Sequence, residues 1–388
     1  MVGLNVWHET PTSARGLVEY LFGDSSTTNG ALRARDGHPH PYNASAIIVE
    51  LGNEEQDPTY WDVAAAPILA AMRDECVGLA ARGQVADGQD LSMLRFSVMY
   101  CAWGLANCNA SVVAHIAAAT AQFASSMVWD QHDGAVKAAW ADLAFEQQAG
   151  MDALLRASGW SQPSPFIIGE TNCGPEGMST CSSLNRALVY STYIADATRN
   201  GRALSIMPAV WAYAACDATG LVCGGGDGDA AWLQPALVLS STAVIKQPSW
   251  YAHALAAHSW GDRVLPTLPN RTADPGGNGS FLDVLALGST VNDVDEVAIH
   301  VTFTGLTPRP LRIRVSFGGG AMACDGPVTS QVLSSANVSA FNSVTKPRAV
   351  APVRGEVHVG GGVATVTLLP NSLTVFSLRG CSQPSRVE

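Results

Sequence analysis

Positive charge is scarce in this sequence, and no cluster of Lys and Arg occurs in it. Only 14% of the 388 residues are charged, and 22 Lys and Arg stand against 33 Asp and Glu, which gives a formal net charge of −11 at pH 7. Nucleic acids and anionic membrane surfaces bind basic patches. The charge balance therefore predicts that neither is a partner of this protein.

Long apolar runs are also lacking, although 47% of the residues are hydrophobic. The longest apolar-leaning stretch, residues 111–129, is interrupted by His115, Thr120, Gln122 and Ser125. A membrane-spanning helix needs about 20 predominantly apolar residues in a row. We therefore expect no membrane span, and we expect the apolar residues to fill the cores of one large and one smaller domain.

The nine cysteines include no Cys-x-x-Cys motif, which argues against a zinc ribbon or a thioredoxin-type site. Several lie close together, and this spacing favours local disulfide bonds, with buried free cysteines as the alternative. Because nine is an odd number, at least one thiol stays unpaired. The close pairs are Cys101 with Cys108, Cys173 with Cys181, and Cys216 with Cys223.

The start of the chain is no signal peptide, yet five Asn-x-Ser/Thr sequons favour the secretory route. A longer natural N-terminus would reconcile the two observations. We therefore expect a glycosylated protein that is secreted or located in the cell wall. The sequons are at Asn43, Asn109, Asn270, Asn278 and Asn337.

A glycine-rich stretch, residues 224–229, carries two aspartates but matches no ligand-binding motif. It lacks the Lys of a phosphate-binding loop and the terminal Glu of an EF-hand. We expect a flexible loop there, and we expect neither a metal nor a cofactor in this protein.

Two glutamates follow short apolar runs that predict buried strands. Residues 46–49 lead into Glu50-Leu51-Gly52-Asn53-Glu54, and Phe166-Ile167-Ile168-Gly169 leads into Glu170. A single Glu at a strand end is often only a solvated loop residue. A pair at the carboxyl ends of parallel strands, however, is the arrangement that glycoside hydrolysis requires.

Strand-like and helix-like segments alternate from residue 46 to about residue 213, which predicts a parallel sheet of βα units. About five units are present, so we predict a partial (β/α)8 barrel, roughly strands four to eight, over residues 1–265. The predicted strands are residues 46–49, 94–100, 126–129, 166–168 and 203–207, and the predicted helices are residues 14–21, 60–82, 111–124, 135–158 and 182–200.

A second region follows a Pro-, Gly- and Asn-rich linker at residues 266–280. Alternation of apolar and polar residues with a period of two predicts an antiparallel β-sandwich over residues 281–388. Cys324 and Cys381 are candidates for a disulfide bond within this sandwich. The alternating runs are residues 281–286, 296–303, 311–317, 356–359, 363–369 and 373–378.

Three segments near the front of the chain have the order and spacing of a known family. They are VEYLFGD from Val18, LRARDGHPHPY from Leu32, and ELGNEE from Glu50. Together they resemble the α-L-arabinofuranosidases of glycoside hydrolase family 51, and the resemblance covers essentially the whole chain at moderate fidelity. It implies a retaining enzyme that releases α-L-arabinofuranosyl residues from cell-wall polysaccharides or glycoconjugates. A homo-oligomer is compatible with the family.

The resemblance assigns roles to four residues. Glu54 corresponds to the general acid/base on barrel strand four, and Glu170 to the nucleophile on strand seven. Asn53 would hold the 2-hydroxyl of the sugar beside the scissile bond. His132, at the end of a Trp-Asp-Gln-His segment, would border the nucleophile, with a packed strand-end histidine as the alternative.

Two further matches are weaker. Trp211 is a candidate stacking surface for the sugar, as is Trp129, although tryptophans at strand ends often only seal the core. Gln234 lies in a Trp-x-Gln segment whose polar residue can reach the sugar in the family.

Members of the family carry three more barrel strands ahead of the segment that matches here at residue 16. The resemblance therefore implies a chain without the N-terminal part of the barrel. Two alternatives stay open at this point. One is a catalytically impaired homologue or carbohydrate-binding remnant. The other is a different retaining glycosidase of clan A, such as a xylosidase or a glucanase.

Overall fold

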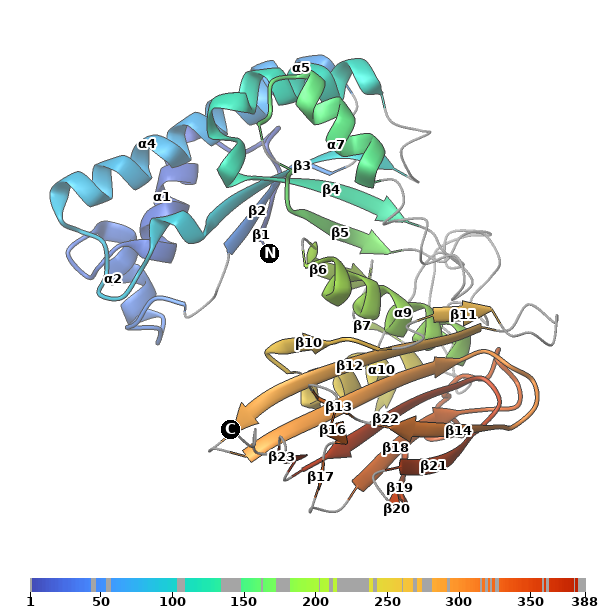
Figure 1. The fold of residues 1–388 in the computed structure, drawn as a ribbon. Coiled ribbons are helices and arrows are strands. Elements are labelled where there is room, and N and C mark those ends of the chain that lie inside the picture. The colour runs from blue at the N-terminus through green and yellow to red at the C-terminus, as the bar shows by residue number, and fades with distance from the viewer. Residues whose placement is uncertain are drawn as a thin grey trace. The chain divides into compact units, whose positions relative to one another are not determined.

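The chain divides into two compact units, and each is described by itself. Unit 1 comprises Met1–Asp133 and Glu146–Ile168, and unit 2 comprises Gly134–Phe145 and Gly169–Glu388. The computed structural model (Figure 1) describes residues 2–42, 47–53, 57–102, 109–133, 148–161, 163–171, 182–201, 203–208, 212–214, 237–239, 243–259, 261–267, 271–273, 281–291, 294–314, 316–317, 320–321, 323–324, 328–357, 359–360, 363–379 and 381–382.

A six-stranded sheet runs in the order β1-β2-β3-β4-β5-β6, and the pairs from β1 to β4 are parallel. The prediction of a partial barrel is confirmed. One strand, β1, was not predicted, because three residues with a central glycine give too short a pattern. The strands are β1 (Val2–Leu4), β2 (Ile47–Leu51), β3 (Leu94–Ala102), β4 (Met127–Asp133), β5 (Phe166–Thr171) and β6 (Ala203–Pro208).

Helices link the strands of unit 1, as the βα pattern predicts. Thr10 begins the first helix with a capping box, in which its side chain and that of Ser13 each bond the other's backbone N–H. α1 packs against α4, and α5 packs against α7. The elements are α1 (Pro11–Phe22), α2 (Thr28–Arg35), α3 (Pro58–Tyr60), the π-helical turn η1 (Trp61–Ala65), α4 (Ala66–Arg82), the 3-10 turns η2 (Leu91–Met93) and η4 (Ala121–Ser126), α5 (Ala110–Thr120) and α7 (Gln148–Ala157).

Several predictions for this part of the chain lie outside the described residues. Of the predicted helix 135–158, the structure describes α7. Of the six closely spaced cysteines, Cys101 lies in β3 and the other five are outside the described residues, so their pairing stays a prediction. Cys76 on α4 is a free, half-buried cysteine, and burial raises the pKa of its thiol to about 11.

The first described helix of unit 2 is α9 (Leu184–Asn200), which ends as predicted at Asn200-Gly201. Gly201 adopts φ +67°, a left-handed conformation that favours glycine. A second helix, α10 (Pro248–His258), packs against α9 and was not predicted. Three short strands, β7 (Ala212–Ala214), β8 (Leu237–Leu239) and β9 (Val244–Lys246), form a small sheet.

Antiparallel sheets in the C-terminal part confirm the predicted β-sandwich. The larger sheet has the strand order β10-β12-β13-β22-β18-β19. β11, which also pairs with β12, lies within the stretch that was predicted as a linker. A smaller sheet runs β14-β21-β20. Phe303, Phe376 and Leu368 share one buried core. The strands are β10 (Arg263–Leu265), β11 (Arg271–Ala273), β12 (Phe281–Val291), β13 (Val294–Phe303), β14 (Arg309–Arg314), β15 (Ser316–Phe317), β16 (Gly320–Ala321), β17 (Ala323–Cys324), β18 (Val328–Ser334), β19 (Val353–Val357), β20 (Val359–Gly360), β21 (Val363–Leu368), β22 (Ser372–Leu378) and β23 (Cys381–Ser382).

Cys324 and Cys381 lie directly opposite each other in the antiparallel pair β17–β23. Directly opposite residues of an antiparallel pair have Cα atoms about 4.5–5.5 Å apart, which is within the usual Cα range of a disulfide bond. We predict a Cys324–Cys381 disulfide in the oxidised protein. Peptide mapping without reductant should find the two cysteine peptides linked. Recovery of both as free thiols from non-reduced protein would refute the pairing.

Among the described residues, no helix is long and apolar enough to cross a membrane.

Candidate active site

The carboxyl end of the parallel sheet carries a layer of polar side chains above an apolar one. Ile48, Val128 and Ile167 form a buried cluster on one face of the strands. Because side chains alternate along a strand, Glu50 on β2 points to the same face as Ile48. Asp130 and His132 on β4 likewise point to the same face as Val128. Polar groups thus replace apolar ones as the strands approach their carboxyl ends.

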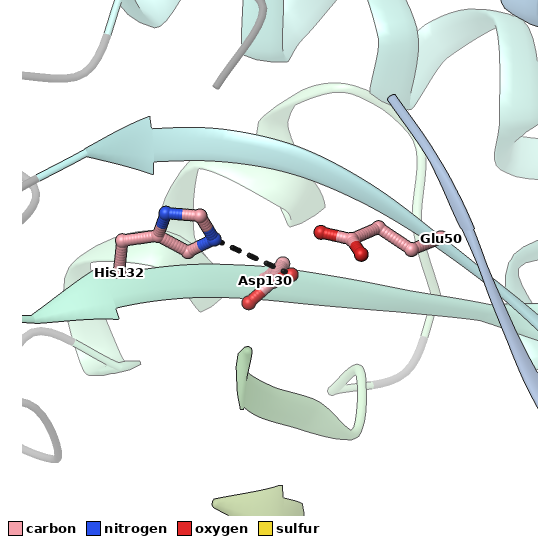
Figure 2. Close-up of side chains that lie close together, drawn as sticks. All are labelled: Glu50, Asp130 and His132. Carbon is pink, nitrogen blue, oxygen red and sulfur yellow. Dashed lines mark ion pairs between the residues drawn. The ribbon is translucent and has the colours of Figure 1, made fainter. Parts of the chain in front are cut away.

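Figure 2 shows that Glu50, Asp130 and His132 converge. One ligand atom from each lies within 4.8 Å of those of the other two. His132 Nε2 is 4.0 Å from Asp130 Oδ2. Asp130 and His132 are 0% and 1% exposed, and Glu50 is half-buried. Two carboxylates and one imidazole are therefore gathered in a place that is largely closed to water, with Asp130 between the other two side chains.

Ser97 on β3 supports this cluster from the strand between β2 and β4. Its backbone is in register with Glu50, and its hydroxyl donates a hydrogen bond to Asp130 Oδ2 at 3.4 Å. Buried carboxylates are stable only when hydrogen bonds or opposite charges compensate them. Ser97 supplies a hydrogen bond to Asp130, and His132 Nε2 lies 4.0 Å from the same carboxylate oxygen, where a protonated imidazole would form an ion pair.

The same three side chains are of the types that ligate divalent metals, namely one imidazole and two carboxylates. Among the residues that the structure describes, they are the set close enough to share one ion. The sequence analysis expected no metal. The cluster therefore allows two uses, a metal site or a hydrogen-bonding network beneath a sugar.

The predicted residue Asn53 lies just beyond β2 and is exposed. Gly52 before it has φ +90°, and a Cβ there would lie 2.8 Å from the hydroxyl of Tyr60. Glycine is thus required both by the backbone conformation and by the close approach of Tyr60.

The other predicted site residues are only partly placed. The backbone of Glu170 lies in β5, as predicted, and its side chain is outside the described part. Glu54, Trp211 and Gln234 also lie outside the described residues. Their roles stay predictions.

Sequence reasoning missed Glu50, Asp130 and Ser97 as members of one cluster. The signal for Asp130 was present, since it stands two residues before His132 and so shares its face. Trp129 faces the other way. It is 1% exposed and stacks on Phe166 with ring centroids 5.4 Å apart, so it seals the core rather than meeting a sugar.

Two family models match the chain. The Alpha-L-arabinofuranosidase 1 domain matches residues 5–75, which include Glu50 and Glu54, and the Alpha-L-arabinofuranosidase C-terminal domain matches residues 230–372. No curated protein matches the chain.

Solved structures with the same fold include three arabinofuranosidases of low sequence identity. The family 51 enzyme of Thermotoga petrophila RKU-1 is 15% identical, with 97% of this chain and 74% of that one covered and a TM-score of 0.66. The arabinose complex of the Thermotoga maritima enzyme gives 15% identity, coverage of 97% and 75%, and a TM-score of 0.67. A family 51 enzyme of Bifidobacterium longum is 12% identical, with 97% of this chain and 75% of that one covered and a TM-score of 0.66.

Proposed function

The chain belongs to glycoside hydrolase family 51, and on that premise we propose that it hydrolyses α-L-arabinofuranosides with retention of configuration. The observation that carries the proposal is the polar cluster at the carboxyl ends of β2 and β4. Its member Glu50 stands near the end of β2, two residues before Gly52 and four before Glu54 in the sequence. In a parallel barrel this edge is where catalytic side chains are placed.

The proposed reaction has two steps. Glu170 attacks the anomeric carbon while Glu54 donates its proton to the departing oxygen, which gives a covalent arabinosyl-enzyme and releases the rest of the glycan. Glu54, now ionised, then takes a proton from water as the water attacks the same carbon and frees Glu170. Retaining enzymes perform this sequence with two carboxyls about 5–5.5 Å apart.

Asn53 and His132 position the sugar in this proposal. Asn53 holds the 2-hydroxyl, where hydrogen bonds strengthen toward the transition state. In this proposal the His132 ring, which lies beside Asp130 and Glu50, bonds a hydroxyl of the arabinosyl ring. This role needs no metal ion.

The substrate class we propose is an arabinose-bearing glycan met along the secretory route or in the cell wall. Asn109 and Asn337, two of the five sequons, are exposed and therefore accessible to glycosylation. Glycans on these two residues in the protein from its native source would support this location.

Turnover of 4-nitrophenyl α-L-arabinofuranoside tests the function, with the product anomer followed by proton NMR. We expect the α-anomer of arabinose to form first. The matching β-D-xylopyranoside and β-D-glucopyranoside should be poor substrates, and a preference for either would favour another clan A glycosidase. Binding of arabino-oligosaccharides by the folded protein without any turnover would favour the carbohydrate-binding alternative.

Replacing Asp130 with asparagine is expected to lower kcat/KM about 10- to 100-fold, because a misplaced positioning group costs that much. Asparagine keeps the size of the side chain and can still accept from Ser97, but it removes the negative charge that holds His132. The matched control is Asp62→Asn, which removes the same charge from an exposed Asp62–His115 pair at 2.9 Å and should leave kcat/KM unchanged. Equal activities of the two variants would contradict the positioning role.

A further inference from the structure

An exposed tryptophan stands at the catalytic edge of the parallel sheet. Trp7 is 49% exposed, whereas a tryptophan in a folded protein is normally largely buried. It was not a candidate in the sequence analysis, and the cluster of Glu50, Asp130 and His132 does not include it.

Strand pairing places Trp7 at the same edge of the sheet as the turn Gly52-Asn53. Leu4 at the end of β1 is in parallel register with Leu51 at the end of β2, and Gly52 N–H donates to the Leu4 carbonyl at 3.1 Å. Both chains leave the sheet from this level. Trp7 therefore lies in the βα loop that neighbours the loop with Asn53, and such loops build the active sites of barrels.

The loop holds Trp7 in place. The N–H groups of His8 and Glu9 both donate to the Asn5 carbonyl at 2.9 Å, which forms a tight turn. Val6 beside it is buried and anchors the turn. Because the Val6 side chain points into the core, the adjacent Trp7 indole stays at the surface in a defined position.

Tyr60 links Trp7 to the turn before Glu54. The Trp7 and Tyr60 rings lie 6.1 Å apart at 52°, and Tyr60 is 1% exposed. The Tyr60 hydroxyl in turn occupies the space that a side chain on Gly52 would need. Gly52, Tyr60 and Trp7 thus form one continuous packed row from the strand end to the surface.

We propose that Trp7 is a specificity-determining residue that stacks on the sugar of the leaving group, on the outer side of the acid/base. This inference rests on the proposed function. In the order β1-β2-β3-β4, the loop after β2 stands between Trp7 and His132. His132 serves the arabinosyl ring, so Trp7 faces the other side of the scissile bond. The apolar face of a sugar ring fits the flat, half-exposed indole.

Calorimetric titration of an arabino-oligosaccharide into protein carrying Glu170→Ala tests the proposal without turnover. Adding Trp7→Ala should weaken binding about tenfold, since aromatic stacking contributes an interaction of this size. Trp7→Phe should restore most of the affinity. The affinity for free L-arabinose, which has no leaving-group sugar, should be the same in all three proteins.

Val77→Ala is the matched surface control. Val77 is 70% exposed on α4 and lines a cavity with Leu94, the first residue of β3, so it lies at the opposite end of the strand. It should leave oligosaccharide affinity unchanged. Three outcomes would overturn the proposal. Trp7→Ala and its parent could bind the oligosaccharide with equal affinity, or Trp7→Ala could weaken binding of free L-arabinose as much as binding of the oligosaccharide. Trp7→Phe could also fail to restore the oligosaccharide affinity. If binding depends on Trp7 but the protein with Glu170 intact shows no turnover of 4-nitrophenyl α-L-arabinofuranoside, only the proposed hydrolysis is overturned.

Discussion

Glu170→Ala should lower kcat for 4-nitrophenyl α-L-arabinofuranoside by a factor on the order of 10⁴ or more, as losses of a covalent nucleophile do. Without the Glu170 carboxylate no arabinosyl-enzyme forms. Hydrolysis must then occur by direct attack of water in a single step with a higher barrier than either step of the two-step reaction. The stability of the fold should change little. Steady-state rates measured alongside thermal unfolding separate the chemical loss from misfolding.

Added azide provides the internal control for this variant. In Glu170→Ala, azide can occupy the vacated side of the sugar and give the β-arabinosyl azide, the product of a single inversion. In Glu54→Ala the first step survives with a good leaving group, and azide should give the α-product. Glu75→Ala, which removes an Arg82 partner on α4, should retain full activity. Turnover by Glu170→Ala within tenfold of the parent would refute its assignment.

Local pattern was enough to predict much of this fold. Apolar runs before Glu50 and Glu170 predicted β2 and β5, and Asn200-Gly201 predicted the end of α9. These features depend on neighbours within a few residues. Period-two alternation likewise predicted β12, β13 and β22, because one face of each strand is buried against the same core.

Features that depend on distant partners were not predicted. β1 is three residues long and is defined by its pairing with β2. β18 carries Ser330 and Gln331 among its apolar residues, which weakens its alternation, yet it pairs with both β19 and β22. Short or polar strands are specified by the sheet around them more than by their own sequence.

The candidate site shows the same limit at the level of single side chains. Glu50 and Asp130 are 80 positions apart in the numbering and come together only through β3, which fixes the register of β2 and β4. A sequence pattern gives the face to which each side chain points. It does not give the neighbour across the sheet, and the same is true of the contact between Trp7 and Tyr60.

Arg199→Met is expected to destabilise the protein by about 3–5 kcal/mol at pH 8, the cost of removing one partner from a buried ion pair. Arg199, in the last turn of α9, binds Asp196 at 3.0 Å and Asp283 on β12 at 2.5 Å. It also donates to the Val284 carbonyl at 2.7 Å. Methionine fills similar space but leaves two carboxylates facing each other without a cation.

The loss should depend on pH through Asp196. Burial raises the pKa of Asp196 to about 7, and the charge of Asp283 adds to the rise while Arg199 opposes it. The folded pKa therefore lies above the unfolded one. Between about pH 4 and 7 the folded state binds more protons than the unfolded state, so this group's contribution to stability falls as pH rises through that window. Without Arg199 the folded pKa rises further, and the cost grows from pH 5.5 to pH 8.

Urea unfolding of the parent and Arg199→Met at pH 5.5 and pH 8 measures this difference. Arg379→Met is the control, because Arg379 pairs with Glu296 of β13 at 3.1 Å and its side chain is 69% exposed. Such surface pairs contribute about 0–1 kcal/mol, so the control should change little at either pH. Adding Asp196→Asn to Arg199→Met should recover stability mainly at pH 8, since the amide stays neutral where the carboxyl would ionise. A loss of equal size at both pH values would mean that Arg199 acts through packing alone, without the buried charges of Asp196 and Asp283.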